Sequence, residues 1–214
     1  ERFPATLQLG LAAFAFSVVL GVPLGILSAV KRGGPLDMIG KFVALIGQSA
    51  PVFWLGLMLM FFLSVQLEWL PPYGRQEKTS IILPGITLGW FYVAANLRLL
   101  RSAMLNVLDS EYVKLARAKG VSEKVVIWKH ALRNALIPVL TFAGITLGGL
   151  VTGSLVVETV FAWPGLGQLA VKALIGVDYP LLQAVVVVFT LMYVIAAMLV
   201  DIMYAYIDPR IRYA

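Results

Sequence analysis

The chain has 214 residues, of which 60% are hydrophobic and 13% charged, and its mean hydropathy is +0.90. Soluble domains average about 45–50% apolar and about 25% charged residues, so this composition excludes intrinsic disorder and argues against a soluble enzyme. The sequence has no cysteine and one histidine, His130, which leaves no disulfide framework and no thiolate or histidine-based metal centre. The remaining class is an integral membrane protein.

Five apolar stretches are each long enough to cross the roughly 30 Å core of a bilayer as a helix. They are residues 7–30, 42–67, 82–97, 135–157 and 181–200. Thr6 is the predicted N-cap of the first helix, and Pro51 predicts a kink in the second. Residues 69–85 and 162–179 are predicted outer loops. Their aromatic residues Trp69, Tyr73, Trp163 and Tyr179 are expected at the membrane interface.

The basic residues divide unequally between the two sides of this arrangement. Thirteen of the 17 lysines and arginines lie on one side, most of them between the third and fourth stretches. The positive-inside rule places that side and the C-terminus in the cytoplasm, so the net charge of +6 indicates topology and not nucleic-acid binding. An outside start also predicts a further span upstream of Glu1, which would make six in all.

The central parts of the five stretches contain no acidic residue, lysine, arginine or histidine. Proton-driven carriers need such groups at depth, so this class is disfavoured, whereas sodium coupling through backbone carbonyls stays open. Arg98 and Asp201 lie near the cytoplasmic ends, where anchoring or pairing between helices explains them.

Small residues recur at four-residue spacing, which lets helix backbones approach closely in lipid. Packing within the chain is the favoured interpretation, and an interface with another subunit is the alternative. The pairs are Gly21 with Gly25, Gly144 with Gly148, and Gly149 with Gly153. Next to Pro51, Gln48 and Ser49 either line a translocation pathway or are buried polar partners at a structural kink; the sequence favours neither.

The segment at about 106–133 is the longest connection on the basic side. Asp109 is a predicted N-cap, Gly120 suits the position that ends a helix, and Ser122 is the predicted N-cap of a second helix. Val113, Ala116 and Gly120 share one face of the first helix. The small side chains of Ala116 and Ala118 would let a protein surface approach closely. Docking of a soluble motor and contact with anionic lipid both fit this pattern.

Residues 111–139, EYVKLARAKGVSEKVVIWKHALRNALIPV, resemble the EAA-type loop of ABC importer permeases of the peptide, nickel and glutathione branch. The generic motif has two alanines where this chain has Tyr112 and Val113. Further similarity covers nearly the whole chain: ERFPATLQLG at the start, AVKRG at 29–33, ETVFAWPGLG at 158–167, DYP at 178–180 and DPRIR at 208–212.

The resemblance implies an all-α transmembrane, type I (MetI-like) helical bundle in a single permease domain over residues 1–214. It implies that the loop docks on a separate ATPase. The residues it assigns to coupling are Glu111, Tyr112, Ala116, Arg117, Ala118, Lys119, Gly120, His130, Arg133 and Asn134. Implied partners are a second related permease, two ATP-binding subunits that hold ATP and Mg, and an external solute-binding protein. This chain would bind no cofactor itself, and would lie in a bacterial or archaeal cytoplasmic membrane.

Three functions are therefore compared. The favoured one is the permease subunit of an ATP-driven importer for short peptides or similar small solutes. A stand-alone channel or secondary transporter is the alternative. An intramembrane enzyme is disfavoured, because His130 has no nucleophile or metal set beside it.

Overall fold

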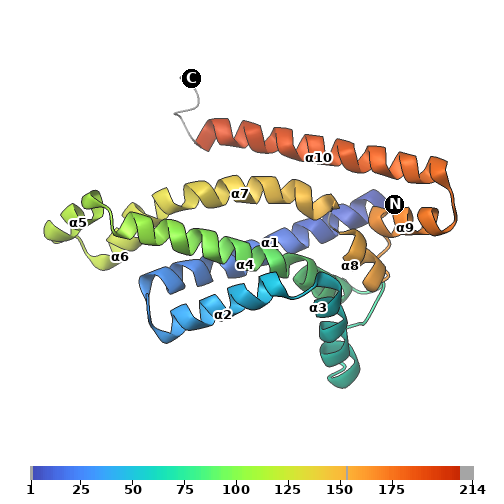
Figure 1. Cartoon of the computed structure of the whole chain (residues 1–214), viewed down its shortest axis with the longest axis horizontal. Helices are drawn as coiled ribbons and strands as arrows, with labels where there is room; N and C mark the ends of the chain where they lie inside the picture. The colour runs from blue at the N-terminus through green and yellow to red at the C-terminus, as the bar shows by residue number, and fades with distance from the viewer. Residues whose placement is uncertain (1, 153, 208–214) are drawn as a thin grey trace.

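The computed structural model describes residues 2–152 and 154–207, and every regular element within these ranges is a helix (Figure 1). The long helices are α1 (Arg2–Val30), α2 (Pro35–Ser49), α4 (Ile82–Leu108), α7 (Leu132–Thr152) and α10 (Tyr179–Ile207). The shorter elements are α3 (Val52–Leu59), η1 (Met60–Gln66), η2 (Lys78–Ile81), α5 (Glu111–Ala118), α6 (Glu123–Val125), η3 (Val126–Ala131), α8 (Leu155–Val160) and α9 (Leu166–Ile175). Four helices of the described part are long and apolar enough to cross a membrane. A fifth span results if the bent pair Pro35–Ser49 and Val52–Gln66 is counted as one.

Helices α1 and α4 lie against each other along most of their length, and α7 packs against both. Glycines make this close approach possible. A Cβ atom on Gly21 would lie 2.9 Å from the Cβ of Asn96, and one on Gly25 would lie 3.0 Å from the carbonyl oxygen of Leu97. The first small-residue pair therefore packs within the chain, as the favoured interpretation of the sequence expected.

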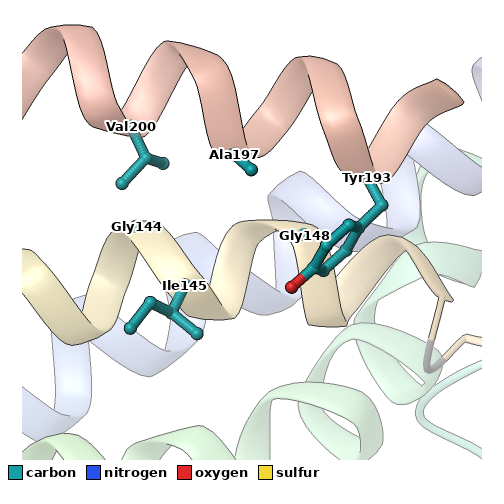
Figure 2. Close-up of a pocket in the computed structure, with 6 residues that line it drawn as sticks. All are labelled: Gly144, Ile145, Gly148, Tyr193, Ala197 and Val200. Atoms are coloured by element: carbon teal, nitrogen blue, oxygen red, sulfur yellow. The ribbon is translucent and has the colours of Figure 1, made fainter. Parts of the chain in front are cut away.

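The second pair of glycines faces α10. A Cβ atom on Gly144 would lie only 2.2 Å from Cγ1 of Val200, and one on Gly148 would lie 2.9 Å from the ring of Tyr193. Figure 2 shows Val200 and Tyr193 reaching from α10 toward these two glycines of α7. This α7–α10 seam is also packing within the chain, and it encloses a hollow of about 80 Å³.

The second apolar stretch is broken more sharply than a kink. Helix α2 begins with Pro35 at its first position and ends at Ser49, and α3 begins after Pro51 at an angle of 110° to it. Proline has no backbone N–H to continue the hydrogen-bond ladder, and it disfavours helical geometry in the residue before it, Ala50. Figure 1 shows α3 turning away from the line of α2; both helices pack on α4, but α2 also contacts α1 whereas α3 contacts α8.

Several predicted boundaries are wrong. Helix α1 begins at Arg2, so Thr6 lies buried inside it and is no N-cap. The fourth apolar stretch forms two helices, α7 and α8, instead of one. The predicted outer loop at 162–179 contains helix α9, whose ten residues are too few to cross a bilayer.

Candidate functional site

At one end of the bundle, α5 and the α6–η3 segment form a helical hairpin that projects past the neighbouring helices (Figure 1). We call residues 110–131 the coupling hairpin, after the role that the sequence resemblance implies for them. Ser110 and Ser122 are the N-caps of its two helices, so the predicted cap at Asp109 is wrong by one residue and the one at Ser122 is confirmed. Gly120 has a φ of +78°, a left-handed conformation that favours glycine, and it ends α5 as expected.

The inner side of the coupling hairpin is fixed to the bundle. Val113 and Val126 are completely buried. The hydroxyl of Tyr112 donates to the carbonyl oxygen of His130 at 3.3 Å and accepts a hydrogen bond from the Asn134 amide at 2.7 Å. These contacts join α5 to the start of α7, so the hairpin is expected to move together with the helices that flank it.

An ion pair closes the turn of the hairpin. The Arg117 guanidinium donates two hydrogen bonds to the Glu123 carboxylate, at 2.7 and 3.1 Å, and a third to the carbonyl oxygen of Leu108. The hydrogen bond to Glu123 raises the pKa of the Arg117 guanidinium above its ordinary value. The pair spans the turn at Gly120 and joins the end of α5 to the start of α6.

The outer side of the hairpin exposes both apolar and charged side chains. Leu115 is 56% exposed and Trp128 is 62% exposed, and Ala118, on the same helix as Leu115, is also exposed. Val113, which shares a helix face with Ala116 in the sequence pattern, is completely buried, whereas Ala116 is only half-buried. The remaining predicted coupling residues are Glu111, Lys119 and Arg133, which are exposed, and Ala116 and His130, which are half-buried.

The two predicted pathway residues are the last two of α2. The Arg98 guanidinium of α4 donates a hydrogen bond to the side-chain oxygen of Gln48. Ser49 is exposed and lines a shallow hollow of about 410 Å³ beside the break at Pro51. Gln48 therefore has a polar partner, whereas Ser49 borders open space, and the two residues do not share one site.

Sequence analysis missed a buried polar cluster at the opposite end of the molecule. The Glu158 carboxylate is completely buried and accepts hydrogen bonds from the hydroxyls of Thr6 and Ser154, both at 2.8 Å, and from the backbone N–H of Gln168 at 3.0 Å. Thr6 also accepts a hydrogen bond from the N–H of Leu166. Glu158 and Thr6 together satisfy two otherwise free N–H groups at the start of α9.

Glycines and a tryptophan complete this cluster. A Cβ atom on Gly165 would lie 2.3 Å from a carboxylate oxygen of Glu158, so no larger residue fits there. Trp163 is 1% exposed and donates from its indole nitrogen to the carbonyl oxygen of Ala5 at 2.9 Å. Trp163 therefore packs inside the protein, whereas the other three aromatic residues predicted at the interface, Trp69, Tyr73 and Tyr179, are exposed. In the sequence, the one indication of this cluster was Glu158, an acidic residue directly after the apolar stretch 135–157.

In the described ranges no three histidine, aspartate or glutamate side chains come together in a way that could hold a metal ion.

Comparison with solved structures defines the fold. A chain of the MetNI methionine ABC transporter, in an inward-facing conformation, superposes with a TM-score of 0.80 at 23% identity, covering 97% of this chain and 94% of that chain. A chain of an amino acid ABC transporter with histidines gives 0.77 at 14% identity, covering 96% and 92%. The fold is therefore the all-α bundle of a MetI-like ABC importer permease.

The sequence places the chain within this class. Residues 21–213 match the family described as binding-protein-dependent transport system inner membrane component, and the chain belongs to that family. A glutathione transport system permease protein of Pectobacterium atrosepticum is 47% identical over 99% of this chain and 69% of its own length. A dipeptide transport system permease protein of Alkalihalophilus pseudofirmus is 40% identical over 98% and 71%. The chain is a permease subunit of an ABC importer, and the family resemblance of the sequence is confirmed.

Proposed function

We propose that the coupling hairpin is the surface on which a separate ATP-binding subunit docks. The observation that supports this most strongly is its two-sided character. Leu115 and Trp128 are exposed on the outer side, while Val113 and Val126 are completely buried on the inner side. Large apolar side chains exposed together at a protein surface are typical of contact sites. A surface anchored in this way can pass a displacement to the bundle.

The proposed assembly contains this chain, a second homologous permease, two ATP-binding subunits and an external solute-binding protein. Family membership supports a membrane, an ATPase partner and a solute-binding partner; the stoichiometry is part of the proposal. ATP and Mg would be bound and hydrolysed on the ATP-binding subunits. Their closure would move the hairpins, and the spans would alternate between inward- and outward-open arrangements. Gln48 and Ser49 remain candidates for lining the pathway.

The proposed cargo is a short peptide or a glutathione-like solute. Relatives at 47% and 40% identity are named for glutathione and dipeptide transport, and both solutes carry peptide-type amide bonds and free carboxylates. The excess of basic residues at the hairpin end supports a cytoplasmic hairpin and C-terminus in a bacterial inner membrane.

Cross-linking tests the docking surface directly, because this chain has no cysteine of its own. In the assembled transporter, Ala118→Cys is expected to cross-link to an ATP-binding subunit. Val177→Cys, at an exposed position of the opposite end, is the control and is expected not to do so. Equal thiol labelling of both variants with no cross-link from position 118 would contradict docking.

Transport tests the geometry of the turn. Gly120→Ala forces a Cβ into a left-handed conformation at a cost of about 1–2 kcal/mol, although no atom lies within 4 Å of it. Gly33→Ala is the matched control, because Gly33 has the same φ of +78° and equally open space. We expect ATP-driven dialanine or glutathione uptake to fall at least about fivefold for the first variant only. Equal uptake by both variants, or uptake by this chain alone without ATP, would refute the proposal.

A further inference from the structure

A basic pocket lies between α2 and α4, away from the coupling hairpin. Its volume is about 260 Å³, and its lining combines three cationic side chains with three apolar ones. The lining residues are Lys41, Arg98 and Arg101 together with Ala44, Leu45 and Leu97. The three cationic residues belong neither to the coupling hairpin nor to the glycine contacts between helices described above.

The charges around the pocket do not balance. Asp37, with 1% of its side chain exposed, binds Arg101 at 2.7 Å and Lys41 at 3.0 Å. Arg98 hydrogen-bonds only to the uncharged amide of Gln48, and within the described part of the chain no carboxylate lies at ion-pair distance from it. One carboxylate therefore faces three cations, and the pocket retains a surplus of two positive charges that attracts an anion.

The surroundings of the pocket indicate what kind of anion fits. The floor is apolar, since Ala44 and Leu97 are at most 2% exposed. On the adjoining outer side of α2, Phe42 and Leu45 are both 63% exposed. Lys41 lies within about two turns of the start of α2, at the basic end of the molecule where a span meets the membrane surface. An anion joined to long apolar chains satisfies both parts of this surface.

We propose that this pocket binds the phosphate headgroup of an anionic membrane phospholipid, with an acyl chain lying along the exposed side of α2. Basic pockets between membrane helices are suited to anionic headgroups. The guanidinium of Arg98 and the ammonium of Lys41 supply the charge-assisted hydrogen bonds to the phosphate oxygens. Arg101 stays paired with Asp37 and forms the inner wall. The lipid would join α2 to α4 beside Gln48, independently of whether the hairpin docks an ATPase.

Native mass spectrometry of the purified transporter tests the pocket, with phosphatidylglycerol as the probe and phosphatidylcholine of the same chain length as the neutral comparison. Lys41→Gln and Arg98→Gln are each expected to weaken phosphatidylglycerol binding about fivefold and to leave phosphatidylcholine binding unchanged. Lys31→Gln removes the same charge from the neighbouring α1–α2 turn, outside the pocket lining, and is expected to change binding less than twofold. Arg101 is left intact so that Asp37 keeps a partner.

A thermal measurement provides the second readout. Phosphatidylglycerol is expected to raise the unfolding temperature of the unmodified transporter and of Lys31→Gln, but not of the double variant Lys41→Gln/Arg98→Gln. Equal phosphatidylglycerol binding by the pocket variants and Lys31→Gln would overturn the proposal. Displacement of phosphatidylglycerol by the same concentration of inorganic phosphate, or of a short anionic peptide, would also overturn the proposal, because the bound anion would then not need to be a lipid headgroup.

Discussion

The α7–α10 seam offers a prediction that can be worked out from single atoms. Gly144→Ala places a methyl group 2.2 Å from Cγ1 and 3.0 Å from Cγ2 of Val200, well inside contact distance. Overpacking of this kind destabilises a protein by about 1–3 kcal/mol. Alanine has a better helix propensity than glycine, and this offsets about 1 kcal/mol of the loss. We therefore expect a net loss of up to about 2 kcal/mol, equivalent to a fall in Tm of up to about 8 °C.

The same helix contains a matched control. Gly149→Ala meets only the hydroxyl of Tyr92, at 3.3 Å, so it is expected to keep or slightly raise the Tm. The double variant Gly144→Ala/Val200→Ala removes both Cγ atoms and leaves the Cβ of residue 200 at 3.1 Å, which a small shift relieves. Thermal unfolding of the detergent-solubilised transporter, at one fixed heating rate, compares all three. The packing argument fails if Gly144→Ala and Gly149→Ala behave alike, or if Val200→Ala restores nothing.

Two further predictions concern buried polar groups, and the same thermal assay checks both. Glu158→Ala removes the acceptor of three hydrogen bonds, two of them from buried hydroxyls, and should cost about 3 kcal/mol. Glu68→Ala, at an exposed outer acid, should cost less than about 0.5 kcal/mol; equal values would show that the cluster around Glu158 does not hold α9 in place. Asp37→Ala removes the carboxylate partner of Arg101 and should lower the stability by about 2–3 kcal/mol. This loss is smaller than the one expected on breaking a fully buried ion pair, because 21% of the arginine side chain is exposed. Asp109→Ala breaks an exposed pair with Arg32 at 3.8 Å and should cost at most about 1 kcal/mol, so a larger loss there than at Asp37 would contradict this ranking.

Local patterns predicted the elements well, because hydropathy and glycine spacing act within a few residues. The five apolar stretches all form helices, and Gly120 has the left-handed conformation that its place after a helix predicts. The break at Pro51 was located correctly, but its 110° angle was not foreseen. A proline determines where a helix ends, whereas the packing of α2 on α4 and of α3 on α8 determines the angle between the two parts.

Contacts between distant residues could not be predicted in the same way. Glu158 binds the hydroxyl of Thr6 across 152 positions of the sequence, and no periodic pattern connects them. Helix α9 was assigned to a loop because its apolar run is short and glycine-rich at its start, yet Glu158 and Thr6 stabilise its first turn from outside. The inward turn of Val113 has a similar cause: helical periodicity identifies a face, but only the packed bundle determines which neighbour covers it.

The arrangement of polar and apolar contacts bears on how the proposed docking would move the spans. The coupling hairpin continues from α4 at one end and into α7 at the other, so a displacement of the hairpin acts on both helices at once. Gly21 and Gly25 bring α1 close to α4, and Gly144 and Gly148 bring α7 close to α10. Small-residue contacts of this kind depend on shape and not on bonds that must break, so helices joined by them can tilt without leaving a buried charge unpaired. Fixed polar networks at Asp37 and Glu158, toward the two ends, would then determine which helices move as one body. Under this mechanism, Gly144→Ala should reduce ATP-driven uptake as well as stability, and Val200→Ala should restore both together.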